Sequence, residues 1–104
     1  MNFSDLMSLR KHLSIQHHVP GRIRIKFGLA LLADPRAKAV KEAAKGRRQP
    51  ACVRDVRVNL LTRNIVIEYD PAVVRPEILH EALTTGDEDR FNQLAAELEA
   101  VSAA

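Results

Sequence analysis

The stretch S-I-Q-H-H-V-P-G-R-I-R-I-K-F, residues 14–27, decides the fold. After Pro20-Gly21 the alternation is strict: one side of the chain is apolar, and the other side carries Arg22, Arg24 and Lys26. Because successive side chains of a strand point to opposite faces, this pattern predicts a half-buried strand. One face of that strand belongs to the core, and the other is a cationic surface.

The residues before this break include two neighbouring histidines. If Pro20-Gly21 does not disturb the two-residue alternation, the strand extends back through these residues. Its apolar side then includes Ile15, His17 and Val19, and its basic side includes Gln16 and His18. Pro20 cannot donate a hydrogen bond to a neighbouring strand, and Gly21 permits a bulge or a tight turn. The chain can therefore also reverse here, in which case residues 15–19 form an extra strand.

The charges of the chain are unevenly distributed. A length of 104 residues suits one small domain with a single modest core. Residues 1–63 carry fourteen Lys and Arg against four Asp and Glu (+10), whereas residues 64–104 carry two against nine (−7). Either the two halves neutralise each other, within the fold or across a homodimer, or the basic half binds an anionic partner.

Several features favour a cytoplasmic location. The chain has one cysteine, Cys52, which excludes an internal disulfide and is typical of a reducing compartment. Residues 1–11 have no long apolar run and carry an early acid, unlike a secretory signal peptide. No stretch approaches the roughly 20 apolar residues that cross a bilayer. We therefore expect any membrane association to be made through a partner.

Three segments are predicted: an N-terminal helical arm (1–12), a ferredoxin-like domain (13–86) and a C-terminal amphipathic helix (87–104). Besides the strand at 22–27, the periodicity of the central segment predicts a helix from Pro35 to about Lys45, strands at 52–60 and 65–70, and a helix from about Pro76 to Thr85. This order lacks only the last strand of a ferredoxin-like α+β sandwich with an antiparallel sheet.

A helix takes the place of the missing fourth strand, because residues 87–104 show apolar side chains at helical spacing and no β alternation. This leaves one edge of the sheet without a neighbour. The C-terminal helix, the N-terminal arm or another chain must cover such an edge, so we expect a homodimer to be one way of completing it.

Three segments carry a resemblance to a known family: H-H-V-P-G-R-I-R-I-K-F, I-V-I-E-Y-D-P and R-P-E-I-L-H-E-A-L. They resemble the cysteine-less branch of the heavy-metal-associated domains, which occur alone and at the N-termini of bacterial metal-transporting P-type ATPases. The resemblance covers about residues 17–85 and implies a ferredoxin-like sandwich. Metal-binding members hold a soft metal with a Cys-x-x-Cys pair. The corresponding connection here reads G-L-A-L-L-A-D-P, so metallochaperone activity is not expected.

The V-P-G-R-I-R motif also resembles the N-terminal segment of transporters associated with bacterial iron-storage compartments. This resemblance implies an interaction or targeting role near metal transport or storage. Cations at alternate strand positions form a ridge with steps of roughly 6–7 Å, suited to an acidic peptide or a row of phosphates. The residues expected to contact an acidic protein or a membrane surface are His18, Arg22, Arg24 and Lys26. Alternatively, the ridge is only the solvated face of an amphipathic strand.

Two other functions are weighed against this one. Imidazole is a common ligand of metals and haem, so a metal ion or haem on His17 and His18 is a second hypothesis, although adjacent strand residues point to opposite faces. Nucleic-acid binding is a third hypothesis. It is disfavoured because Phe27 and Tyr69 are both expected to point inward, away from bases. Neither a catalytic motif nor a phosphate-binding glycine loop is present, so we expect neither an enzyme nor a bound cofactor.

Overall fold

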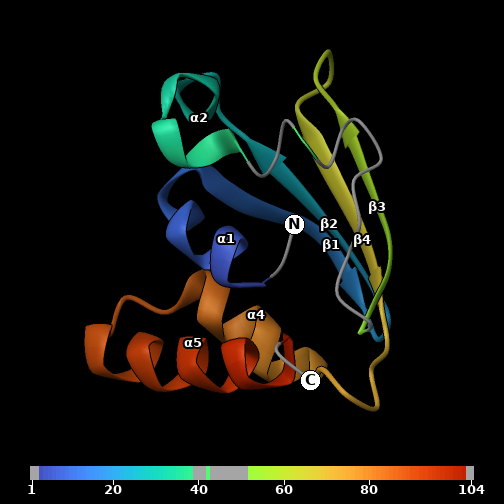
Figure 1. Ribbon diagram of the computed structural model, residues 1–104, viewed down its shortest axis with the longest axis vertical. Coiled ribbons are helices and arrows are strands. Elements are labelled where there is room, and N and C mark those ends of the chain that lie inside the picture. The colour runs from blue at the N-terminus through green and yellow to red at the C-terminus, as the bar shows by residue number, and fades with distance from the viewer. Residues whose placement is uncertain (1–2, 39–41, 43–51, 103–104) are drawn as a thin grey trace.

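The computed structural model describes residues 3–38, 42 and 52–102, which form an antiparallel sheet with helices on one of its faces (Figure 1). The strands are β1 (Leu13–Val19), β2 (Arg22–Phe27), β3 (Val53–Asn59) and β4 (Asn64–Tyr69). Their spatial order is β1-β2-β4-β3. The helices are α1 (Phe3–Ser8), α2 (Ala30–Ala33), α4 (Pro76–Thr84) and α5 (Glu88–Ser102), with 3₁₀ turns η1 (Arg10–His12) and η2 (Pro35–Ala37). This α+β arrangement is compatible with a ferredoxin-like sandwich.

The chain reverses at Pro20-Gly21, so that β1 returns alongside β2 with Val19 opposite Arg22. Gly21 has a φ of 90°, a left-handed conformation that glycine adopts without a steric cost. The alternative in which residues 15–19 form an extra strand is therefore confirmed. The free edge of β2 is covered by β1, and α5 packs elsewhere, against α1 and α4.

A β-bulge in β1 changes the direction of the side chains that follow it. Gln16 is an extra residue without a partner on β2. Beyond the bulge, His18 lies opposite the buried Ile23, on the face that the helices cover, whereas His17 and Val19 are exposed. The expectation that His17 and Val19 continue the apolar side and His18 the basic side is wrong, because it assumed an unbroken two-residue period.

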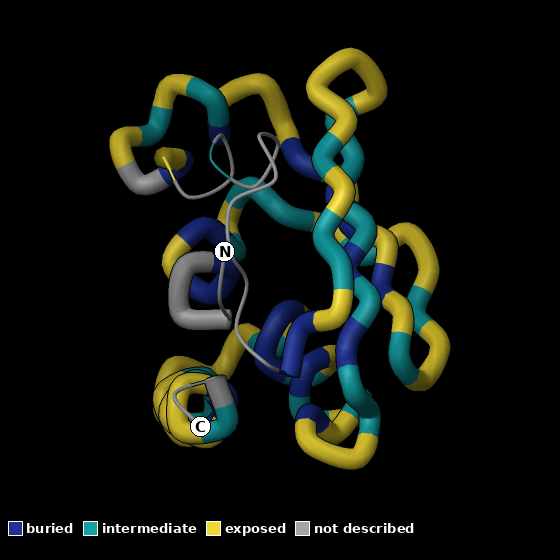
Figure 2. Tube along the Cα trace, turned by 45° about the vertical axis from the view of Figure 1, so that its right-hand side comes forward, coloured by how far each residue is buried: buried dark blue, intermediate teal, exposed yellow. Residues whose placement is uncertain are grey.

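One core joins the sheet to the flanking segments (Figure 2). The predicted alternation of β2 is confirmed, since its three apolar residues are at most 1% exposed and its three cations are exposed. The inward direction of Phe27 and Tyr69 is also confirmed. The core further includes Leu6, Met7 and Leu9 of the N-terminal arm, and Leu94 and Leu98 of α5. The predicted arm and C-terminal helix therefore pack in the same core as the sheet.

The connection after β2 differs from the prediction. Residues 28–34 were expected to be an irregular connection, but the short helix α2 forms there because Leu31 is fully buried in the core. The helix predicted from Pro35 to about Lys45 lies partly outside the described residues, of which 35–37 form the 3₁₀ turn η2 and Lys38 and Glu42 are helical. The helix predicted from Pro76 is confirmed as α4.

Among the described residues, no helix is both long and apolar enough to cross a membrane.

Candidate anion-binding face

The face of the sheet opposite the helices is not covered by any of the described residues, and it carries the predicted cations. Arg22, Arg24 and Lys26 are all exposed at alternate positions of β2. Arg57 of β3 extends this surface, because both Arg57 and Arg24 lie in register with Val66 on the intervening strand β4. Two strand spacings separate the two arginine backbones by about 10 Å. We refer to Arg22, Arg24, Lys26 and Arg57 as the cationic face.

Arg57 was not among the predicted site residues. Its outward direction follows from the alternation of residues 52–60, but its proximity to Arg24 depends on the strand order, which places β4 between them. The pattern of one strand does not contain this information.

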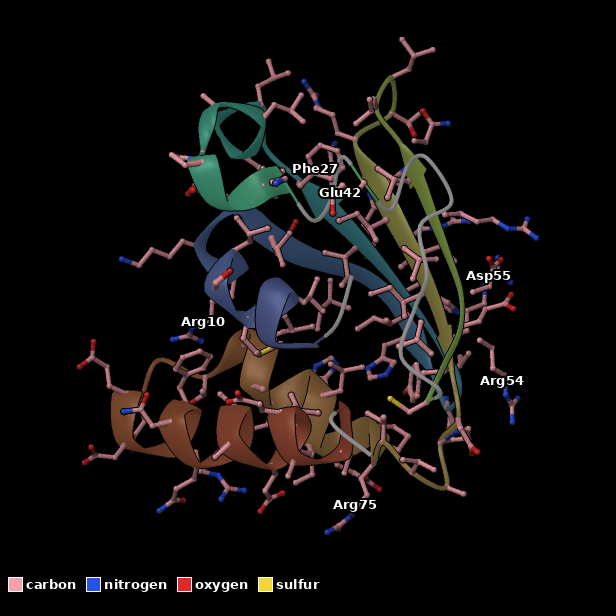
Figure 3. The ribbon with its side chains drawn as sticks, in the orientation of Figure 1. Arg10, Phe27, Glu42, Arg54, Asp55 and Arg75 are labelled. Carbon is pink, nitrogen blue, oxygen red and sulfur yellow. The ribbon has the colours of Figure 1, made fainter. Side chains whose placement is uncertain are left out.

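The two acidic side chains of this face lie toward one end of it. Glu68 lies opposite Arg22 on one side and Asp55 on the other. Asp55 accepts a hydrogen bond of 2.9 Å from Nε of Arg57, and its outward direction is visible in Figure 3. Within the described part of the chain, Arg24 and Lys26 form no ion pair. Unpaired positive charge is therefore concentrated toward the β3–β4 turn.

Two shallow depressions lie at this more positive end. The first, of about 330 Å³, is bordered by Lys26 and Arg63. Nε of Arg63 is buried and has no hydrogen-bond partner among the described residues. The second depression, of about 360 Å³, separates Arg24 from Arg57; between them it is lined by Asn59, Thr62, Asn64 and Val66. The guanidinium of Arg63 adds a further positive charge beside the first depression.

The four residues predicted to contact an anion are not brought together. The bulge places His18 on the helix-covered face, while the other three form the cationic face. The two histidines of the metal or haem hypothesis, His17 and His18, lie on opposite faces, as their adjacency in a strand suggests. Among the described residues, no group of three or more His, Cys, Asp or Glu side chains could hold a metal ion.

Comparisons with protein-family models, with curated proteins and with solved structures found no match to this chain.

On the helix-covered face, His18 connects the sheet to α4. Its Nε2 shares a hydrogen bond of 2.7 Å with the hydroxyl of Tyr69, and its Nδ1 lies 3.2 Å from Nδ1 of His80. Burial raises the pKa of Tyr69, an effect that a backbone hydrogen bond from Gly21 opposes. His80 was not among the predicted site residues, because its contact with His18 depends on the bulge in β1.

The environment of His18 makes the folding stability depend on pH. Burial, and then the positive charges of His80 and His17, lower the pKa of His18 below its ordinary 6.5. As the pH falls below 6.5, the unfolded chain takes up a proton here before the folded chain does, so stability decreases. Above 6.5 this contribution is fully present. In urea denaturation of metal-free protein, we expect stability to decline below pH 6.5 and His18→Gln to reduce that decline. An unchanged decline in the variant would contradict this.

Proposed function

We propose that the chain is a non-enzymatic interaction module that binds an anionic partner through the cationic face. The observation that supports this most directly is that three cations of one strand and a fourth from β3 lie together on an uncovered sheet surface. The acidic helix α5 does not neutralise them, because it lies with the other helices on the opposite side of the sheet (Figure 1).

If these cations formed only an ordinary solvated surface, we would expect them to be exposed and scattered apart from one another. They are exposed, but they are also grouped beside two depressions, one of which is lined by Arg63. This grouping supports a binding surface. The link to bacterial metal transport or storage rests on the resemblance of the V-P-G-R-I-R segment, and we retain it as part of the proposal.

The same surface does not favour nucleic acid. RNA-binding sheets of this shape stack bases on exposed aromatic side chains. Phe27 and Tyr69 are buried against the helices, and the centre of the open face is occupied by Val66. An acidic peptide or the headgroups of an anionic membrane need only the charges and the spacing of the strand. We therefore propose a partner of this chemistry.

The test removes the three charges of β2 together. The variant Arg22→Ala/Arg24→Ala/Lys26→Ala is compared with Lys11→Ala/Lys38→Ala/Arg75→Ala, which removes the same charge from exposed positions outside β2. Binding is measured by vesicle sedimentation with phosphatidylcholine containing phosphatidylserine, and by calorimetry with a polyglutamate peptide. The two probes distinguish a membrane from an acidic protein.

We expect the β2 variant to bind the preferred probe about tenfold or more weakly, because exposed ion pairs contribute about 0.2–1 kcal/mol each and three are removed. The control variant should lose much less, and added salt should weaken the binding of the unmodified protein. Equal losses in the two triple variants would show that net charge alone acts. Equal retention of binding would show that β2 makes no contact.

A further inference from the structure

We propose that His18 and His80 form a binding site for a divalent transition-metal ion of the zinc, nickel or copper type, which both histidines ligate through Nδ1. The site is independent of the cationic face, since it lies on the other side of the sheet. His18 comes from β1 and His80 from the middle of α4, so the two ligands belong to segments 62 residues apart.

The first support for this site is the geometry of the two rings. Their Nδ1 atoms are 3.2 Å apart, their planes differ by 7° and their centroids are 5.4 Å apart. The nitrogen atoms are therefore much closer than the ring centres, and the rings meet edge to edge through Nδ1. Two zinc–nitrogen bonds of about 2.0–2.1 Å at a tetrahedral angle place the nitrogens about 3.3 Å apart. In the metal-free protein this contact is a hydrogen bond in which one Nδ1–H donates to the other ring, and an ion that displaced this proton would find the two nitrogens at the spacing of two ligands.

The second support is the hydrogen bond on the other nitrogen of His18. A ligating histidine usually donates its remaining ring N–H to a fixed acceptor, which selects the tautomer and orients the ring. Here Nε2 lies 2.7 Å from the hydroxyl oxygen of Tyr69, whose side chain is fully buried. When Nε2–H donates to this oxygen, the lone pair of Nδ1 points toward His80.

The third support is access to solvent. Both histidines border a groove of about 650 Å³ between β1 and α4, and Ser14, Gln16, His17 and Thr84 are among its other lining residues. His80 is exposed and His18 half-buried, so an ion can enter without unfolding. Because the described residues supply two ligands and no third carboxylate, thiolate or imidazole, water or an external ligand completes the coordination. Imidazole ligands favour zinc, nickel and copper over calcium or magnesium.

The test uses protein prepared without a polyhistidine tag and titrated with zinc alone by calorimetry. The imidazole nitrogen signals in NMR spectra report which ring atoms bind. The variants are His80→Ala, His18→Gln and Tyr69→Phe. His17→Ala is the matched control, because His17 borders the same groove but points to the other face of β1 and forms no three-ligand group with His18 and His80 among the described residues. Circular dichroism establishes that each variant is folded.

We expect one zinc ion per chain, with changes at Nδ1 of both His18 and His80. The control His17→Ala should bind as the unmodified protein does, and Tyr69→Phe should bind about 10–100-fold more weakly, as the loss of an orienting hydrogen bond usually costs. His80→Ala should lose more affinity than Tyr69→Phe. The proposal is overturned if the unmodified protein binds no zinc, if His80→Ala binds as tightly as it does, or if His17→Ala causes the larger loss.

Discussion

Replacing Leu94 by alanine should lower the free energy of unfolding by about 2–5 kcal/mol, the usual cost of truncating a buried leucine. Leu94 belongs to α5, the helix predicted as a separate C-terminal segment, and its side chain is 0% exposed. Small domains are stable by only about 5–15 kcal/mol in total. The loss would therefore remove a large part of the stability, although Leu94 lies in the outer helix of the helical layer.

The matched control is Leu61→Ala, which makes the same chemical change at a side chain that is 95% exposed in the β3–β4 turn. Surface substitutions of this kind usually change stability by less than about 0.5 kcal/mol. Urea denaturation of both variants, analysed with a common slope, measures the difference. If the two variants were equally stable, α5 would not be an energetic part of the fold.

The second large effect on stability is expected from replacing Arg10 (Figure 3), which connects the N-terminal segment to both C-terminal helices. Its Nη1 donates to the carbonyl oxygens of Thr85 at 2.7 Å and Ala82 at 3.3 Å, and its guanidinium carbon lies 4.0 Å from the ring centroid of Phe91. The last carbonyls of a helix have no partner within the helix, so Arg10 satisfies groups that α4 leaves free.

Arg10→Ala should cost about 2 kcal/mol, since hydrogen bonds from charged groups contribute about 1.5–3 kcal/mol and a cation over an aromatic ring about 0.5–1. Arg10→Lys should restore only part of this, because an ammonium group lacks the planar fork that bonds carbonyls and covers a ring at once. Thermal denaturation measures both variants, with Lys11→Ala as the exposed neighbouring control. Full stability in Arg10→Lys would show that charge alone is sufficient.

Much of the fold could be predicted from the periodicity of the sequence. β2 follows from its strict alternation, and α4 follows from apolar residues at helical spacing after Pro76. Both patterns are local, and burial on one face enforces them. The short helix α2 could not be predicted in the same way, since its four residues are too few to show a period and it forms because Leu31 docks in the core.

The candidate site could be predicted only in part. The alternation of β2 correctly predicts that Arg22, Arg24 and Lys26 are exposed, because successive side chains of an extended strand point to opposite faces. To predict that Arg57 lies near Arg24, one must know the strand order. To predict the contact between His18 and His80, one must know both that order and the bulge. These features depend on residues distant in sequence, and a pattern read along one strand contains no information about them.

The extra residue at Gln16 also affects how the sheet meets its surroundings. β1 is an edge strand, and residues 13–19 include no side chain that is always ionised, so charge does little to repel another chain there. The bulge interrupts the regular run of backbone groups along this edge. Deleting Gln16 should restore an unbroken ladder with His18 still opposite Ile23, and should give neighbouring molecules a regular edge with which to pair. We therefore expect the bulge at Gln16 to hinder pairing of β1 with a strand of another molecule.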